Sequence, residues 1–94
     1  MKSDEFEITG VVELFPQKGG WYFVRVPGEY TKLFKEFSTR GLVPIIARLG
    51  KTEWKTSLLP IGDGTQFIAL NAKVRKSENI TLGDKVRIFF RLNT

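Results

Sequence analysis

One pattern occurs twice in this chain, about 44 residues apart, and it narrows the range of possible folds more than any other feature. FVRVPGEY at residues 23–30 aligns with FIALNAKV at 67–74, and VPIIARL at 43–49 aligns with VRIFFRL at 86–92. Each copy therefore reads as a strand, a Pro or Asn, a short helix, a Gly and a second strand. Two related halves of this kind predict a barrel with a pseudo-two-fold axis, because interlocked halves leave few free strand edges.

Alternating apolar and polar residues predict about six strands, which are separated by Gly- and Pro-containing turns and by two short helices. Within the first strand, Gly10 indicates a bulge or a bend. Pro27 should end the second strand because it has no N–H to donate to a neighbouring strand. The predicted strands cover residues 5–15, 21–27, 43–49, 52–58, 65–70 and 85–92. The apolar face of the first one consists of Phe6, Ile8, Val12 and Leu14.

Two short helices are predicted between these strands. Residues 29–37 have apolar side chains at helical spacing, and Gly41 is the expected C-terminal stop. Asn71 has a side chain suited to an N-cap, and the helix that it begins extends to about Glu78. Gly50 can begin a two-residue hairpin turn with Lys51, in which the glycine takes a positive φ. The apolar stripe of the first helix consists of Tyr30, Leu33, Phe34 and Phe37.

The length of 94 residues fits one domain, residues 1–94, and is too short for two separate cores. Hydrophobic residues make up 41% of the chain and include eight Phe, which is enough for a buried core. We therefore expect a mostly β protein, a small closed or double-split β-barrel with two short helices and two pseudo-symmetric halves. Apolar runs are short, the N-terminus has no apolar signal segment and cysteine is absent, so we expect no membrane segment and a cytoplasmic location.

The residue types that carry most enzyme chemistry are missing. The sequence has no His and no Cys, which excludes Ser-His and Cys-His nucleophiles and the commonest zinc and iron ligand sets. Asp occurs three times, as Asp4, Asp63 and Asp84, and no acidic pair has a recognisable metal-loop spacing. We therefore expect a protein that is not an enzyme, with no catalytic residues, no metal and no cofactor.

Basic residues are concentrated in the second half of the chain. Residues 1–47 have six basic and six acidic side chains, whereas residues 48–94 have nine basic and four acidic ones. A positive surface is typical of phosphate binding, so a nucleic acid is one candidate partner. The structural alternative is that Arg75 braces the barrel by pairing with Asp84 or a loop carbonyl, while nearby lysines are solvated. The residues proposed for phosphate contacts are Lys73, Arg75, Lys76, Arg87 and Arg91.

A second candidate site is the loop Pro60–Gly64, with the sequence PIGDG. The backbone N–H groups at Gly62 and Gly64 could bind an anion. The acid between them argues against an anion, and both glycines also suit a plain loop with positive φ. Together with Trp54 and Arg75, these glycines form the alternative small-ligand or catalytic site.

Aromatic residues offer a third kind of site. In the second strand, Trp21, Phe23 and Arg25 point away from the face shared by the other residues. They form an exposed aromatic and basic surface unless a helix covers them. Phe89 is also directed outward, which predicts that it lies under a helix or in a dimer contact. The candidate stacking platforms, which have core packing as their alternative role, are Trp21, Tyr22 and Trp54.

A longer pattern extends over nearly the whole chain. It comprises WYFVRVP at 21–27, Gly41 to Val43, and Trp54, Ser57, Leu58, Pro60, Gly62, Gly64, Leu70, Val74, Arg75, Gly83, Asp84 and Val86. This pattern resembles that of a bacterial and archaeal family of domains of unknown function, often found beside a YdeI/OmpD-associated domain. The resemblance implies a double-split β-barrel and no established activity.

The segment ALNAKVRKSENITLGDKVRI, residues 69–88, resembles the swapped-hairpin unit of AbrB-type transcription factors. In those factors a strand, a short helix with Arg and a Gly-Asp corner recur, and two chains interlock. The resemblance implies DNA binding through basic residues on the barrel face. The first half of this chain reads GEYTKLFKEF and GLV instead, so it lacks the Arg and the Gly-Asp corner.

From the sequence we expect an uncharacterised prokaryotic binding or accessory module, non-enzymatic, with an unknown partner, and either monomeric or homodimeric. One alternative is a nucleic-acid-binding barrel of AbrB-like type that uses the basic second half. The other is a small-ligand-binding or catalytic barrel at the Pro60–Gly64 loop.

Overall fold

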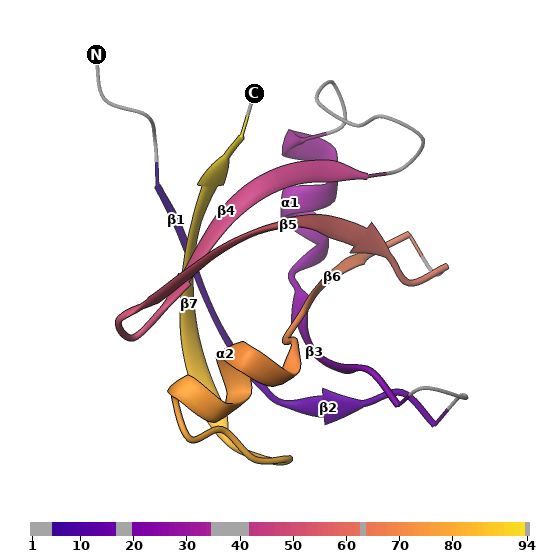
Figure 1. Ribbon diagram of the computed structural model, residues 1–94. Helices are drawn as coiled ribbons and strands as arrows, with labels where there is room; N and C mark the ends of the chain where they lie inside the picture. Colours follow the sequence, from indigo (N-terminus) through magenta and orange to yellow (C-terminus); the bar gives the residue numbers. More distant parts are fainter. Residues whose placement is uncertain (1–4, 17–19, 35–41, 63, 94) are drawn as a thin grey trace.

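Seven strands and two short helices form in the part of the chain that the structure, a computed structural model, describes: residues 5–16, 20–34, 42–62 and 64–93. The strands pair in the order β1-β7-β4-β5-β6-β3-β2, and the sheet curves into a nearly closed antiparallel barrel (Figure 1). The expected mostly β barrel with two short helices is confirmed, with seven strands rather than six. The elements are β1 (Phe6–Val11), β2 (Glu13–Leu14), β3 (Tyr22–Val26), α1 (Gly28–Leu33), β4 (Val43–Leu49), β5 (Thr52–Pro60), β6 (Gln66–Ala69), α2 (Ala72–Ser77) and β7 (Lys85–Leu92).

The additional strand arises because the first predicted strand is interrupted at Val12. β1 pairs with β7, whereas β2 pairs with β3. Between them, the Val12 N–H donates to the Asp84 carbonyl at 2.8 Å, and the Gly83 N–H donates to the Val12 carbonyl at 3.0 Å. The Gly83–Asp84 corner therefore holds the point at which the chain changes from one neighbouring strand to the other.

Of the bulge or bend predicted at Gly10, the bulge does not form. The register of β1 with β7 is continuous through Gly10, so the extra residue of a bulge is absent from this described pair. A Cβ atom at Gly10 would lie 2.8 Å from Cγ1 of Val24, a fully buried residue of β3. Carbon atoms prefer separations of about 3.5–4.0 Å. Gly10 is therefore needed because β1 passes close to β3.

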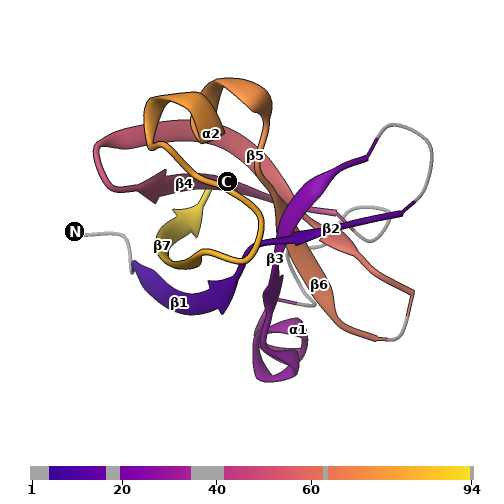
Figure 2. The same cartoon turned by 90° about the horizontal axis from the view of Figure 1, so that it is seen from below.

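The two halves of the chain make equivalent strand pairings, as the internal repeat predicts. β3 pairs with β6, and β4 pairs with β7. β5 pairs with β4 and then with β6, just as the first segment pairs with β7 and then with β3. A shift of 44 residues places α1 (28–33) on α2 (72–77). Figure 2 shows these helices on opposite sides of the barrel.

Apolar side chains from both halves fill the barrel. The rings under α1 pack with centroids 4.9–6.1 Å apart, in edge-to-face and stacked pairs. Those rings belong to Phe6, Tyr30, Phe34 and Phe90. The largest aliphatic side chains that are fully buried include Ile45, Leu58, Ile68 and Ile88.

Two leucines predicted on inward faces are exposed instead. Leu33 is 54% exposed because the short α1 contacts the core through Tyr30 and Phe34, one turn apart. Leu14 is 39% exposed because it lies in the two-residue strand beyond the interruption at Val12. The other positions predicted for the end of this helix, Phe37 and Gly41, lie outside the described residues.

α2 is fixed at both ends. At its start, the Asn71 side chain accepts a hydrogen bond from the Val74 N–H at 2.8 Å, as predicted for an N-cap. At its end, Asn79 takes a φ of 58°, and the Ile80 N–H donates to the Arg75 carbonyl at 2.8 Å. This is a Schellman motif, and its Ile80 is buried. The position of Arg75 within α2 is therefore set by caps on both sides.

The hairpin between β4 and β5 is tied to the end of α2. Leu49 pairs with Thr52, so Gly50 and Lys51 form the predicted two-residue turn, and Gly50 has a φ of 61°. The Glu78 carboxylate accepts hydrogen bonds from the Thr52 hydroxyl at 2.5 Å and from the Lys51 N–H at 3.3 Å.

Neither α1 nor α2, the helices found within the described ranges, is long and apolar enough to cross a membrane.

Candidate functional site

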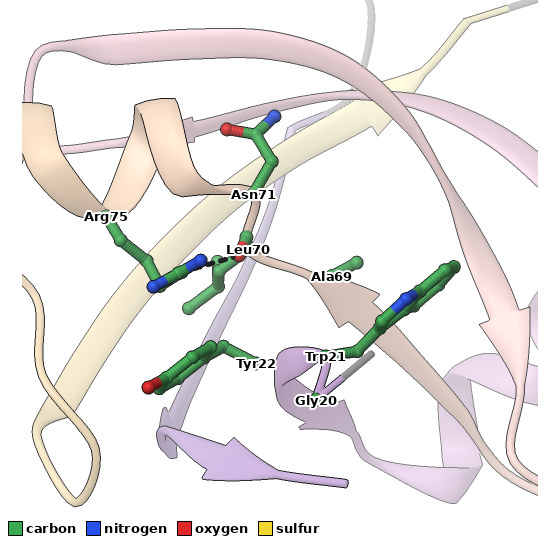
Figure 3. Close-up of a pocket in the computed structure, with 7 residues that line it drawn as sticks. All are labelled: Gly20, Trp21, Tyr22, Ala69, Leu70, Asn71 and Arg75. Atoms are coloured by element: carbon green, nitrogen blue, oxygen red, sulfur yellow. Dashed lines mark hydrogen bonds between the residues drawn. The ribbon is translucent and has the colours of Figure 1, made fainter. Parts of the chain in front are cut away.

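A pocket of about 260 Å³ lies where β6 leads into α2, beside the start of β3. The Leu70 N–H donates to the Tyr22 carbonyl at 2.9 Å, so the segment that enters α2 is held against β3. Two backbone segments that are fixed to each other therefore form the walls. We call this the Arg75 pocket; its lining residues are Gly20, Trp21, Tyr22, Ala69, Leu70, Asn71 and Arg75 (Figure 3).

Arg75 reaches from α2 into this pocket and is held by two contacts. Its guanidinium carbon lies 4.0 Å from the centroid of the Tyr22 ring, and its Nε donates to the Leu70 carbonyl at 3.1 Å (Figure 3). Of the two bracing partners considered from the sequence, the loop carbonyl is observed and Asp84 is not. The Asp84 carboxylate instead accepts hydrogen bonds from Thr81, at 2.9 Å from its N–H and 3.2 Å from its hydroxyl. Within the described ranges, Arg75 forms no ion pair with a carboxylate.

Trp21 lies on the side of the pocket opposite Arg75 (Figure 3). It is 54% exposed, and its ring meets the Phe67 ring edge-to-face at 6.4 Å. The outward aromatic surface expected in this strand is smaller than predicted, because Phe23 is buried. Among the described residues, Phe23 is covered by Phe15 rather than by a helix, with the two ring centroids 3.9 Å apart. The accessible ring at this place is that of Trp21.

The basic residues proposed for phosphate contacts are not gathered into one surface. Lys73 and Lys76 are exposed on α2, whereas Arg75 turns inward over Tyr22. Arg87 and Arg91 lie on β7 and form ion pairs with glutamates of β1, next to β7, and of β5, which lies beyond β4. These pairs are Arg87–Glu7 at 3.0 Å and Arg91–Glu53 at 3.4 Å. Two further arginines are paired in the same way, Arg48 with Glu5 at 3.6 Å and Arg25 with Glu13 at 2.8 Å.

Phe89, the outward apolar residue of β7, is partly covered by a neighbouring side chain. The Arg48 guanidinium lies 4.5 Å from the centroid of its ring. Arg48 is the register partner of Phe89 on β4. A cation–π contact within the sheet thus covers part of the ring that we expected to lie under a helix or in a dimer contact.

The Pro60–Gly64 loop has the expected conformation but does not join the pocket. Gly62 and Gly64 have φ values of 110° and 93°, as predicted. The loop precedes β6, whereas the Arg75 pocket lies at the other end of that strand. Trp54 packs against the barrel core, and its buried Nε1 has no hydrogen-bond partner among the described residues. Of the four residues proposed for a ligand site, Arg75 alone lines the pocket in the described part of the chain.

A second cavity, of about 400 Å³, lies along the seam between the first segment and β3. The internal repeat relates part of it to the Arg75 pocket, since Val26, Pro27 and Thr65 correspond to Leu70, Asn71 and Trp21. The chemistry has diverged, because the residues at the places of Tyr22 and Arg75 are Gln66 and Thr31. The same strand-to-helix junction therefore forms in the first half without an Arg–Tyr pair. The residues that line this cavity are Thr9, Gly10, Val11, Glu13, Arg25, Val26, Pro27, Gly28 and Thr65.

Sequence reasoning singled out Arg75, Trp21 and Tyr22 but did not bring them together. It did not identify Gly20, Ala69 and Leu70, which complete the walls of the pocket. The signal that could have indicated them is the internal repeat, which predicts a strand-to-helix junction in each half. Asn71 was identified as a helix cap, not as a pocket residue. No group of three or more acidic, His or Cys residues within the described ranges is placed to hold a metal ion.

Comparison with protein families places most of the chain in one group. A family model described as "Domain of unknown function (DUF1905)" matches residues 9–89. The match includes every residue of the Arg75 pocket. A search of curated proteins finds no match to the chain.

Proposed function

The chain belongs to this family of uncharacterised domains, and we propose that it is a non-enzymatic cytoplasmic module that binds a small ligand in the Arg75 pocket. The observation that carries the proposal is the state of Arg75. Its cation is held in place over Tyr22 without a carboxylate partner among the described residues, whereas the other described arginines pair with glutamates. A fixed charge without a counter-charge is suited to a ligand that supplies one.

The energetics of Arg75 support this interpretation. Ordering an arginine side chain costs about 2 kcal/mol of rotamer entropy. The contact with Tyr22 contributes roughly 0.5–1 kcal/mol, and the hydrogen bond to Leu70 contributes about 1 kcal/mol. These contributions roughly offset the entropy, so the guanidinium is already ordered before a ligand arrives. Preorganisation of this kind favours binding because the ligand need not immobilise the side chain.

The internal repeat argues against a purely structural role for the Arg75–Tyr22 pair. If the junction between strand and helix required such a pair, the first half would also have one. It has Thr31 and Gln66 at the corresponding positions, and α1 still follows β3 as α2 follows β6. The pair is therefore an addition to the fold in the second half.

The size and composition of the pocket suggest what it accepts. Ligand pockets for drug-sized molecules have volumes of about 300–1,000 Å³, so a pocket of about 260 Å³ suits a smaller molecule. In the described part of the chain, the lining of the pocket has no carboxylate and one hydroxyl. That hydroxyl belongs to Tyr22, whose ring lies beneath the Arg75 cation. This supports binding rather than acid–base or nucleophilic chemistry.

The test is a nuclear magnetic resonance screen of the labelled protein against single-ring fragments at about 1 mM each. We expect some fragments to shift the backbone amide signals of Gly20, Tyr22 and Ala69, and Arg75→Gln to reduce the shifts caused by acidic fragments. Arg87→Gln removes the same charge from the outer surface and is the matched control. If no fragment shifts these amides, or if the shifts map to another face, the proposal is wrong.

A second candidate, nucleic-acid binding of AbrB-like type, is supported by the exposed Lys73 and Lys76 on α2. The ion pairs of Arg87 and Arg91 favour it less, because binding phosphates there would require breaking contacts with glutamates. The test is fluorescence anisotropy of a labelled duplex at about 50 and 200 mM salt. Micromolar binding that weakens steeply with salt, and that Lys73→Gln with Lys76→Gln removes, would support it.

A further inference from the structure

We infer that the ligand of the Arg75 pocket is a single-ring aromatic carboxylate, an inference that rests on the function proposed above. Two side chains on opposite sides of the pocket carry it, Arg75 and Trp21 (Figure 3). Each offers a different kind of contact, and a small aromatic acid can satisfy both.

Arg75 supplies the contact for the acid. A guanidinium has five N–H donors, and Leu70 accepts from the Nε donor. The donors on the two terminal nitrogens have no hydrogen-bond partner among the described residues. One face of the group is covered by the Tyr22 ring, so its edge remains for the ligand. The terminal N–H groups of arginine match the two oxygens of a carboxylate in spacing and direction.

Trp21 supplies the contact for the ring. Its ring meets the Phe67 ring with an angle of 68° between the planes, so the two rings are not stacked face to face. An indole that is 54% exposed beside a pocket has open surface on which a planar ring can stack. Ala69 and Gly20, also in the lining, have little or no side chain and leave room for that ring.

The volume limits the ligand to one ring. A pocket of about 260 Å³ would be roughly 8 Å across if it were spherical, which is below the usual range for drug-sized ligands. One six-membered ring with a carboxylate attached directly or through one carbon fits this span. A nucleotide, with its base, sugar and phosphate, would extend out of the pocket into solvent. The part of a ligand that the pocket itself holds is therefore about one ring in size.

The test uses phenylacetate as the probe, with three comparison compounds. Acetate lacks the ring, 2-phenylethanol lacks the charge, and phenethylammonium reverses it. We expect phenylacetate to bind with a Kd of roughly 0.1–1 mM, as ligand efficiency allows for about ten atoms. Acetate and 2-phenylethanol should bind at least about tenfold more weakly, and phenethylammonium should not bind. The readout is the shift of the pocket amides, together with Trp fluorescence in a Trp54→Phe background, where Trp21 is the sole indole.

Three variants separate the two contacts. Arg75→Gln should weaken phenylacetate by about tenfold or more and leave 2-phenylethanol unchanged, whereas Trp21→Ala should weaken both aromatic probes. Arg75→Lys keeps the charge but loses the planar group, so it should give an intermediate Kd. Arg87→Gln, the matched charge control, should leave the Kd within about twofold. Amide spectra of each free variant establish that it is folded.

The results also distinguish the two levels of the proposal. Equal affinity for phenylacetate and 2-phenylethanol at the pocket amides would show that a ligand site exists and that the assignment to carboxylates is wrong. The inference is also wrong if Arg87→Gln weakens phenylacetate binding as much as Arg75→Gln does. If neither these compounds nor the wider fragment set shifts the pocket amides, the proposed function itself fails.

Discussion

Replacing Gly10 with alanine tests whether the close approach of β1 and β3 is a requirement of the barrel. The new Cβ would lie 2.8 Å from Cγ1 of Val24. Because the favourable separation of two carbons is about 3.5–4.0 Å, one strand must move by roughly 0.7 Å or more, or Val24 must leave its rotamer. Val24 is fully buried, and a valine side chain has little rotational freedom with which to avoid the contact.

The expected cost follows from these numbers. Overpacking a well-packed core costs about 1–3 kcal/mol, while replacing Gly with Ala gains about 0.4–1 kcal/mol by restricting the unfolded chain. Gly10 has no positive φ, so backbone strain adds nothing. We expect a net loss of about 1–2 kcal/mol in the free energy of unfolding. For a chain of this size that corresponds to a decrease in Tm of roughly 5–15 °C.

The assay is urea denaturation of four proteins: wild type, Gly10→Ala, Val24→Ala and the double variant. Val24→Ala is destabilised on its own because it leaves a cavity, but it also removes the atom with which the new Cβ collides. In that background Gly10→Ala should cost almost nothing, which gives a coupling energy of about 1–2 kcal/mol. Gly28→Ala is the control and should be neutral or stabilising, because among the described residues its Cβ would meet Thr65 alone, at 3.7 Å. An equal cost of Gly10→Ala in both backgrounds would refute the steric explanation.

Substitutions at three further residues test individual contacts of α2 and of the sheet. Asn71→Ala removes the acceptor of the Val74 N–H and should lower the free energy of unfolding by about 1 kcal/mol. Asn71→Asp keeps an acceptor and should retain most of the wild-type stability, and thermal denaturation measures both. Glu78→Ala removes the acceptor of the Thr52 hydroxyl and should lower the free energy of unfolding by about 1–2 kcal/mol in urea denaturation. Hydrogen exchange should increase in the β4–β5 hairpin, and no increase there would show that Glu78 does not hold the hairpin. Arg87→Gln breaks an exposed ion pair and should change stability by less than about 0.5 kcal/mol; a larger loss would mean that this pair supports the sheet.

The sequence was sufficient for features that depend on local patterns. Alternation located the strands to within a few residues, and Asn71 and Gly50 identified a helix cap and a turn by their own chemistry. The repeat predicted that β3 and β4 would each have a counterpart. The interruption at Val12 could not be predicted, because the groups that cause it, at Gly83 and Asp84, lie about 70 residues away in the chain.

The site was predicted in part for the same reason. Arg75 and Trp21 have side chains that suggest binding, so composition was enough to identify them as candidates. Their proximity depends on the pairing of β3 with β6, which brings residues 20–22 beside residues 69–71. The Pro60–Gly64 loop was grouped with Arg75 because both belong to one sequence pattern, but β6 lies between them and holds them at its opposite ends.

The equivalent pairings of the two halves have a consequence for the origin of this barrel. A half-length chain with the same order of elements would reach this architecture as a two-fold dimer, since β4 finds both of its partners in the other half. In such a dimer, each junction would be an exact copy of the other, and any substitution would appear at both. Joining the copies in one chain allows each junction to mutate alone. One now has Arg75 above Tyr22, and the other has Thr31 and Gln66. Gene fusion therefore provides a route by which a symmetric scaffold acquires a single, asymmetric binding site.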